Sequence, residues 1–367
     1  MKSATKHIIF IATRLDLPGG IEKAIISTAN LLTEKGYNVS ILITDVTTAC
    51  FYEVDQRIQI NKLELNFGID IKGSALSRKA KMVKDILALR KWFKDSNADI
   101  IIATEYHLSV VSVLSGLHRK FKVYSWEHHH KYALRINTFW RKLMDFSYPK
   151  LSGIICLNDE ENELFSDLNK HVLTIPNFVP VQPSYLVTKE GPQRILTVAH
   201  INYTKGIDRL LDVAKLVFDA DKDLIWKIIG GGDAKPFIEK YIDDLNLSDK
   251  LIIEEPKSND LSIEYRTSDI FVLTSRFECF PMTLLEAMSN SIPCIAFDCD
   301  TGPRHIIRNG VNGLLVEDGD RDLMAELILE VLGYEDYRNE LANQARIDSR
   351  SFSPDHVYLL WDRLLSK

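Results

Sequence analysis

Short apolar runs alternate along the chain with longer segments in which apolar residues recur at helical spacing. The runs are rich in Ile, Val and Leu, as is typical of strands that are buried on both faces of a parallel sheet. Alternation of such strands with amphipathic helices predicts an α/β protein. The first half contains six runs: Ile8–Ala12, Val39–Thr44, Ile100–Thr104, Val123–Trp126, Gly153–Leu157 and Val172–Ile175. The second half contains six more: Ile195–Ala199, Trp226–Gly230, Leu251–Glu254, Ile270–Thr274, Pro293–Phe297 and Leu314–Val316.

Two sets of six strands predict two doubly wound, Rossmann-like domains, and a proline-rich segment separates them. Ile175–Ser184 contains three prolines, which prevent regular secondary structure. We therefore place the first domain at residues 1–180 and the second at residues 181–350. Residues 351–367 follow, and apolar residues at helical spacing predict a terminal helix there. Ligands of doubly wound sheets bind beyond the carboxyl ends of the strands, so candidate residues are sought in the loops that follow them.

The segment Ser275–Cys294 joins two predicted strands and carries the most informative chemistry. A short loop leads into a helix with Pro281 in its first turn, where the missing N–H group costs nothing. Asn290 stands at the far end of this helix, where asparagine tolerates a left-handed cap. Unpaired backbone N–H groups at the start of a helix favour an anion such as a phosphate. The donors that we expect here belong to Phe280, Met282 and Thr283.

Two glutamates flank this helix start. Glu278 and Glu286 lie eight positions apart, one in the loop and one inside the helix. One carboxylate can accept hydrogen bonds from sugar hydroxyls and the other from ribose hydroxyls, so the pair suggests a pocket for a nucleotide sugar. The alternative is a Rossmann-like helix that carries two incidental surface glutamates.

The order of Glu-x7-Glu, Thr301-Gly-Pro303 and Asn309-Gly-Val-Asn-Gly-Leu-Leu-Val316 resembles the C-terminal half of retaining GT-B glycosyltransferases of the large family 4. The resemblance implies an α/β fold of two Rossmann-like domains that face each other across a cleft. The N-terminal domain would bind the acceptor and the C-terminal domain the nucleotide sugar, and the last helix would cross back to pack on the N-terminal domain.

The activity that the resemblance implies is transfer of a hexosyl unit from a nucleotide sugar to a glycan or lipid-linked glycan acceptor. We expect a UDP-linked donor and a role in bacterial lipopolysaccharide, capsule or exopolysaccharide synthesis. Two other functions stay open. One is a non-catalytic GT-B protein that binds glycan or scaffolds a membrane complex, and the other is a GT-B epimerase of UDP-sugars.

The loop 199–206 corresponds to the family pattern Gly-Arg-x4-Lys-Gly, whose Arg and Lys neutralise the diphosphate. Lys205 matches the lysine, but His200 stands at the arginine position. Histidine lacks the bidentate fork of arginine, although a nearby dianion favours the imidazolium, so we expect His200 to face the diphosphate. By the same resemblance, further donor-site candidates are Gly230 near the nucleotide, Glu254 in the base-contacting turn, and Arg304, for which a surface role is equally open.

Two sites in the first half complete the candidate set. Gly19-Gly20 follows the first strand and lets the backbone approach a diphosphate closely, although a tight turn explains the pair nearly as well. The segment Ser125–His130 ends in three histidines, where the family places a Glu-His pair whose histidine points at the donor sugar. His128 is the matching position, with a purely structural histidine as the alternative. The resemblance thus makes Glu278, His128 and Lys205 the catalytic candidates.

We expect neither a metal nor a cofactor. Neighbouring histidines diverge and do not easily share a tetrahedral site, and Asp298-Cys-Asp300 is interpreted as an ordinary strand end. Five cysteines without a CxxC pair favour reduced thiols over disulfides or zinc. Positive side chains and helix dipoles would then replace a cation at the diphosphate.

The net charge of −6 conceals an asymmetry. Residues 1–180 carry 24 Lys+Arg against 19 Asp+Glu, and the remaining residues carry 21 against 32. A basic first half suits an anionic membrane surface, and the basic amphipathic segment Ser74–Lys94 is either a membrane-contacting helix or a solvated one. Nucleic acid is not expected, because the basic residues are not interleaved with aromatics. No apolar run of about 18 residues or signal peptide is recognised, so we expect a cytoplasmic protein in peripheral contact with the inner membrane.

Overall fold

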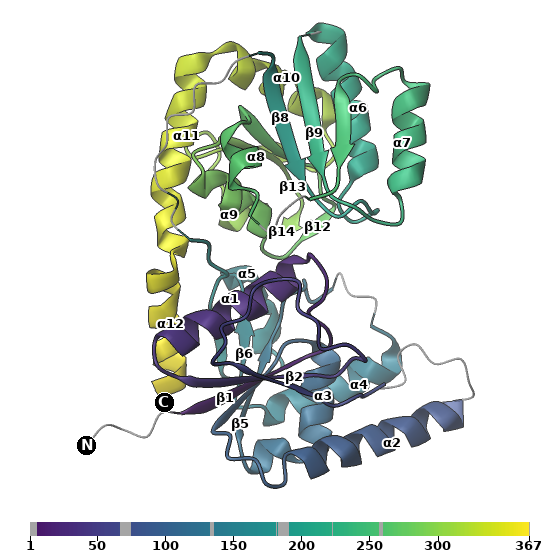
Figure 1. Cartoon of the computed structure of the whole chain (residues 1–367), viewed down its shortest axis with the longest axis vertical. Coiled ribbons are helices and arrows are strands. Elements are labelled where there is room, and N and C mark those ends of the chain that lie inside the picture. The colour runs from purple at the N-terminus through teal and green to yellow at the C-terminus, as the bar shows by residue number, and fades with distance from the viewer. Residues whose placement is uncertain are drawn as a thin grey trace. The chain divides into compact units, whose positions relative to one another are not determined.

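The computed structural model describes residues 6–66, 75–132, 136–180, 182, 191–221, 223–256 and 260–366, which form two compact units (Figure 1). The first unit comprises Met1–Pro176 and Tyr358–Lys367, and the second comprises Asn177–Val357. The division therefore falls a few residues before the expected boundary at 180. Ser74 of the predicted basic helix and residues 181, 183 and 184 of the predicted linker lie outside the described residues.

The sheet of the first unit has seven parallel strands in the order β3-β2-β1-β4-β5-β6-β7. Six of them are the predicted ones, and the edge strand β3 is additional. Its sequence, Gln-Ile-Asn-Lys, has no apolar run because an edge strand is partly exposed to water. The strands are β1 (His7–Ala12), β2 (Asn38–Ile43), β3 (Gln59–Lys62), β4 (Ile100–Ala103), β5 (Lys122–Trp126), β6 (Gly153–Cys156) and β7 (Val172–Thr174).

The helices of the first unit bury apolar faces against this sheet. Two of them begin at asparagine caps: Asn137 accepts from the N–H of Trp140, and Asn158 accepts from the N–H of Glu161. The helices are α1 (Gly20–Glu34), α2 (Ala75–Trp92), α3 (Tyr106–Leu114), α4 (Thr138–Ser147) and α5 (Asp159–Ser166), with 3-10 turns at Leu117–Arg119 and Tyr148–Lys150.

The terminal helix α12 (Pro354–Ser366) supplies the last part of the first unit. Trp361 is fully buried and meets the buried Trp126 of β5 edge to face, with ring centroids 5.1 Å apart. The hydroxyl of Tyr37 donates to Asp362 Oδ1 at 2.9 Å. The C-terminal segment is thus part of the core of the first unit. Figure 1 shows α12 beside α1 and β1.

The sheet of the second unit has six parallel strands in the order β10-β9-β8-β11-β13-β15. A separate two-stranded pair, β12 and β14, lies in the loops and was not predicted, because two residues leave no hydrophobic pattern. The strands are β8 (Gln193–Val198), β9 (Leu224–Ile229), β10 (Leu251–Glu254), β11 (Ile270–Leu273), β12 (Phe277–Glu278), β13 (Cys294–Asp298), β14 (Asp300–Thr301) and β15 (Leu314–Glu317).

The helices of the second unit surround this sheet, and Trp226 of β9 is fully buried in its core. The helices are α6 (Ile207–Ala220), α7 (Lys235–Asp244), α8 (Ser262–Arg266), α9 (Met282–Ser289), α10 (Arg321–Gly333) and α11 (Glu335–Ser349), with 3-10 turns at Pro303–His305 and Arg350–Phe352. Among the helices that the structure describes, none combines the length and the apolar content that a membrane crossing requires.

The ends of α9 differ from the prediction. The helix begins at Met282, so Pro281 is its N-cap with an extended backbone (φ −70°, ψ 106°) and not a first-turn residue. At the other end Asn290 has φ −90°, and the left-handed conformation is taken by Ser291 (φ 62°). Both boundaries shift because the ends of a helix are decided by local hydrogen bonds that the residue types alone do not specify.

Candidate functional site

The strand order of the second sheet reverses between β8 and β11, whose connections lead to β9 on one side and β13 on the other. Ligands of doubly wound sheets bind at such a switch point, outside the carboxyl ends of the strands. The loops that follow these four strands are 199–206, 230–233, 274–281 and 299–302. They carry most of the residues that the sequence singled out in this half of the chain.

Glu278 is a largely buried acidic side chain in these loops, with 9% of its surface exposed. Lys205 Nζ and Ser275 Oγ both donate to its Oε1, each at 2.7 Å. Within the described part of the chain, its second carboxylate oxygen accepts no hydrogen bond from another residue. The arrangement leaves one fixed acceptor that can bind a hydroxyl or N–H group of a ligand.

The backbone at Glu278 is fixed by the Thr301-Gly-Pro turn. Thr301 pairs with Glu278 across β12 and β14, and its Oγ1 donates to the Glu278 carbonyl oxygen at 3.0 Å. A Cβ added at Gly302 would lie 2.7 Å from Glu278 Cβ, so only glycine fits there without a shift. Thr301 has φ 69°, which is an unusual conformation for a β-branched residue and marks local strain.

The loop with Lys205 is packed closely against the same region. Lys205 N donates to Asn202 Oδ1 at 3.0 Å, and Gly206 follows with φ 64°. A Cβ added at Gly206 would lie 2.1 Å from the Thr274 carbonyl oxygen, so glycine permits this approach of backbone to backbone. The backbone of this loop therefore positions Lys205 next to Glu278.

Arg276 was not singled out from the sequence, although it ties the loops of β8 and β11 together. Its guanidinium donates to both carboxylate oxygens of Asp208, at 2.7 and 2.5 Å, and to the Tyr203 carbonyl oxygen at 2.8 Å. The hydrogen bond from Arg276 lowers the pKa of Asp208. No motif marks Arg276, because its partners lie about 70 residues earlier in the sequence.

Glu286 lies inside α9, where its Oε2 accepts from the hydroxyl of Tyr265 at 2.9 Å. Tyr265 belongs to the short helix α8 and is 1% exposed, so it holds the carboxylate from the protein interior. Because α9 begins at Met282, the first-turn donors include the N–H groups of Met282 and Thr283. Phe280 lies before the cap, so the prediction that its N–H is a first-turn donor was wrong. Its ring packs on Phe352.

His200 lies in the loop after β8, close to Gly230 in the loop after β9. His200 is exposed, and its Nε2 lies 3.0 Å from the position that a Cβ on Gly232 would take. Gly230 has φ 158°, and a Cβ there would lie 1.9 Å from the Ala199 carbonyl oxygen. The glycine run therefore packs against the loop that carries His200.

Glu254 and Arg304 already have charged partners. The Glu254 carboxylate lies 3.1 Å from Lys227 Nζ. Arg304 donates from Nε to Asp298 Oδ1 at 2.8 Å, with both side chains partly exposed. Arg304 therefore forms a surface ion pair, and its contact with a donor stays a prediction.

In the first unit, Gly19 and Gly20 begin α1, with Gly19 as the N-cap. A Cβ added at Gly19 would lie 2.0 Å from Glu22 Oε2, so this carboxylate lies over the start of the helix. Burial, followed by the charge of Glu105, raises the pKa of Glu22. A diphosphate at this helix start would have to displace the Glu22 carboxylate.

His128 is 8% exposed and lies against the Trp126 ring, with centroids 4.4 Å apart. Its Nε2 is buried and has no hydrogen-bond partner within the described residues. Burial lowers the pKa of His128 to about 3, helped by the charge of neighbouring His129, so the ring is neutral. A neutral imidazole with a free nitrogen can bind a ligand by one hydrogen bond but cannot supply charge.

The neighbouring Glu127 is buried in a different network. Ser125 Oγ and the hydroxyl of Tyr148 both donate to its Oε1, and burial raises the pKa of Glu127. His130 Nδ1 is hydrogen-bonded to Glu161, so the three successive histidines have separate surroundings. Within the described ranges, no group of three His, Cys, Asp or Glu side chains is arranged to hold a metal ion.

Comparison with known proteins gives two family models that match consecutive halves of the chain. Glycosyltransferase Family 4 matches residues 18–182, and Glycosyl transferases group 1 matches residues 182–348. Among curated proteins, a lipopolysaccharide 1,6-galactosyltransferase of Escherichia coli (strain K12) is 30% identical over 257 residues, which cover 65% of this chain and 67% of that protein.

Two further matches cover nearly the whole chain. The GalNAc-alpha-(1->4)-GalNAc-alpha-(1->3)-diNAcBac-PP-undecaprenol alpha-1,4-N-acetyl-D-galactosaminyltransferase of Campylobacter jejuni is 24% identical over 363 residues, 98% of each chain. A crystal structure of an S. aureus TarM mutant in complex with Fondaparinux, alpha-GlcNAc-glycerol and UDP has a TM-score of 0.81 at 17% identity. The superposition covers 99% of this chain and 100% of that chain, and at this identity it shows a shared fold.

The neutral state of His128 predicts a pH dependence of stability. The unfolded chain binds a proton at this histidine below its ordinary pKa of 6.5, whereas the folded chain does so near 3, so stability is lost as the pH falls between these values. Between about pH 7.5 and pH 5, the wild type should lose about 2 kcal/mol of unfolding free energy more than His128→Gln does. Urea unfolding followed by tryptophan fluorescence measures this, because four of the five tryptophans lie in the first unit.

His200→Gln is the matched control, since it makes the same chemical change at an exposed position. The raised pKa of Glu127 acts in the opposite direction and is lost as a stabilising effect when the pH rises, but it is common to all three proteins. Equal pH slopes for the wild type and His128→Gln would show that His128 is not buried in its neutral form.

Proposed function

Because this chain belongs to the GT-B glycosyltransferases, we propose that it transfers a hexosyl unit from a UDP-linked sugar to a glycan or lipid-linked glycan, with retention of the donor's anomeric configuration. The observation that carries the proposal is the Glu278 carboxylate. One of its oxygens is held by Lys205 and Ser275 beside the start of α9, at the switch point of the second sheet. A fixed acceptor next to a lysine and a helix N-terminus suits a sugar joined to a diphosphate.

The residues divide the work according to their chemistry. Glu278 would accept hydrogen bonds from hydroxyls of the transferred sugar, while Lys205 and the first-turn N–H groups of α9 stabilise the negative charge that develops on the leaving diphosphate. Glu286, positioned by Tyr265, would accept from the ribose hydroxyls. His128, whose Nε2 is buried and has no partner within the described residues, stays a catalytic candidate by resemblance.

The acceptor class is supported by the relatives. One acts on lipopolysaccharide and another carries a PP-undecaprenol-linked saccharide in its name. We therefore propose a role in bacterial surface polysaccharide synthesis, at the cytoplasmic face of the inner membrane. No cofactor or metal is part of the proposal, because Lys205 and the helix dipole of α9 supply positive charge.

A product assay tests this function. The protein is incubated with UDP-glucose, UDP-galactose and their N-acetylated counterparts, with lipid-linked glycan acceptors, in the presence and absence of chelator. A glycosylated product that forms equally with chelator, and whose early proton NMR spectrum shows the donor's anomer, is expected. An epimerised donor without glycosylated product would favour the epimerase, and the opposite anomer would overturn retention.

The two glutamates should act on different kinetic constants. Glu278→Gln loses a charged acceptor at the reacting sugar and should lower kcat about 10- to 100-fold. Glu286→Gln should mainly raise the donor KM, about tenfold, because it removes binding that is equal in ground and transition states. Tyr265→Phe removes the hydrogen bond that positions Glu286 and keeps the carboxylate, so its KM should rise less. Near wild-type kcat/KM in both glutamate variants would show that the pocket is assigned wrongly.

His200 provides a separate test of the diphosphate site. If its imidazolium contacts the diphosphate, donor affinity should weaken as the pH rises from about 5 to 8, the range in which histidine commonly loses its proton. His200→Arg should flatten this dependence, and His200→Ala should weaken binding by about 1–3 kcal/mol. Calorimetric titration with UDP measures all three, and wild-type behaviour of His200→Ala throughout would make the histidine a bystander.

Membrane contact is proposed through α2. Val83 and Leu87 are 55% and 57% exposed and one turn apart, while Met82 and Leu89 of the same helix are buried. The exposed basic residues beside them are Lys81, Lys84, Arg90, Lys91 and Lys94. An exposed apolar pair flanked by cations fits an anionic bilayer surface, where each basic residue contributes about 1 kcal/mol.

Sedimentation with liposomes measures this contact. The protein should sediment with anionic but not neutral vesicles, and salt should release it. Lys84→Glu/Lys91→Glu should abolish binding, whereas Lys215→Glu/Lys240→Glu, the same charge change at exposed lysines of the second unit, should not. Absence of binding at low salt would leave α2 as a solvated helix.

A further inference from the structure

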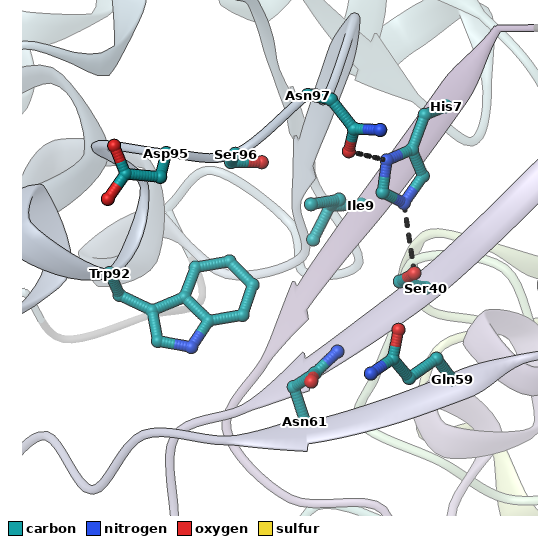
Figure 2. A pocket seen from close by; sticks show the side chains of 9 residues that line it. All are labelled: His7, Ile9, Ser40, Gln59, Asn61, Trp92, Asp95, Ser96 and Asn97. Carbon is teal, nitrogen blue, oxygen red and sulfur yellow. Dashed lines mark hydrogen bonds between the residues drawn. The ribbon is translucent and has the colours of Figure 1, made fainter.

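We propose that the amino-terminal edge of the first sheet carries a second, non-catalytic site that binds one neutral sugar unit of a glycan. A hollow of about 240 Å³ opens there between β1, β2, β3 and the end of α2 (Figure 2). We call it the edge pocket. It is lined by His7, Ile9, Ser40, Gln59, Asn61, Trp92, Asp95, Ser96 and Asn97. The choice of a sugar as ligand rests on the proposed function, whereas the pocket itself does not.

The lining of the edge pocket combines one large aromatic ring with small polar groups. Figure 2 shows the indole of Trp92 on one side of the hollow and the side chains of β1, β2 and β3 on the other. A sugar ring has an apolar C–H face, which packs on an aromatic surface, and a rim of hydroxyls, which need donors and acceptors. The volume lies below the roughly 300–1,000 Å³ of pockets for drug-sized ligands, which suits a single ring.

Three polar side chains of the edge pocket are available to a ligand. The amides of Gln59 and Asn61 and the carboxylate of Asp95 make no side-chain hydrogen bond to another described residue. An amide offers two donors and one acceptor, and a carboxylate offers acceptors, which matches hydroxyls that donate and accept at once. The nine lining residues include no Lys or Arg, so a phosphate or nucleotide is disfavoured there.

The floor of the edge pocket is held in place by His7. Its Nδ1 lies 3.0 Å from Asn97 Oδ1, which can only accept, so Nδ1 carries the proton. Its Nε2 lies 2.9 Å from Ser40 Oγ, within hydrogen-bond distance. These two bonds link β1, β2 and the segment before β4, so the polar floor is rigid before any ligand arrives.

Ser40, His7 and Asn97 are connected in the order of a hydrolytic Ser-His-Asn triad. The backbone around Ser40 does not support that chemistry. Ser40 lies within β2 and is aligned with Ile9 of β1 and Gln59 of β3. Backbone N–H groups around it are therefore used by the sheet and cannot form an oxyanion hole. The network is a support for binding and not a nucleophile.

The edge pocket lies at the opposite end of β1 from the loop that contains Gly19. Six residues of parallel strand span about 20 Å, so one sugar ring cannot occupy both ends. The pocket would therefore bind a unit of the glycan remote from the reacting one, or a second glycan chain. Such a second contact raises the effective concentration of a long acceptor without altering the chemical step.

Saturation-transfer NMR with the methyl α-glycosides of glucose, galactose, N-acetylglucosamine and N-acetylgalactosamine tests this site. At least one of the four should bind the wild type, and Gln59→Ala/Asn61→Ala should bind it about tenfold more weakly, as expected for lost hydrogen bonds. Trp92→Phe, which keeps an aromatic surface, should retain more affinity than Trp92→Ala. The control Asn339→Ala/Asn343→Ala removes two exposed amides of α11 and should change nothing.

Release of UDP from the donor is measured on the same proteins. It should be unchanged in Gln59→Ala/Asn61→Ala, because these residues lie at the far edge of the sheet. Equal binding of the glycosides by this variant and the wild type, or no binding by the wild type, overturns the edge pocket even if the enzyme is active. Conversely, binding that depends on Gln59 and Asn61 in a protein without transferase activity would sustain the pocket and overturn the proposed function.

Discussion

The position of the Glu278 carboxylate depends on contacts between loops and not on any helix or long strand. Lys205 and Ser275 hold its side chain, while Thr301 and Gly302 hold its backbone. Arg276 fixes the neighbouring loops to each other through Asp208. The contacts of Lys205 and Thr301 with Glu278 join segments that follow different strands, so the parallel sheet must form before the site exists. The site is therefore a product of the sheet's strand order.

Glu278 of the second unit and Glu127 of the first have different surroundings. Glu278 is largely buried, and its carboxylate forms an ion pair with Lys205. Glu127 is buried among hydroxyl groups and its pKa is raised, so it acts as a hydrogen-bonding part of the core. Its neighbour His128 is equally buried but keeps one unpartnered nitrogen. A buried polar atom without a partner is uncommon in proteins, and His128 Nε2 is one of seven such side-chain atoms among the described residues.

The sequence predicted twelve of the strands and the division into two units because most buried parallel strands leave uninterrupted apolar runs. It missed β3, β12 and β14, which are an exposed edge strand and two strands of two residues. Motif residues such as Glu278 and Lys205 were recognised, and the structure pairs them. Tyr265 and Arg276 were not recognised, because their roles come from partners that only folding brings near. For the same reason the Asp298 partner of Arg304 could not be inferred.

The helix α12 has a consequence for biosynthesis. The core of the first unit includes Trp361 against Trp126, yet residues 177–357 of the second unit lie between them in the sequence. During translation, Trp361 cannot cover the apolar surface at Trp126 until the second unit and α12 have left the ribosome. Domains that are continuous in sequence can fold as they emerge. Here the unit that is synthesised first is completed last, and a chain cut short before α12 would expose this surface to chaperones and proteases.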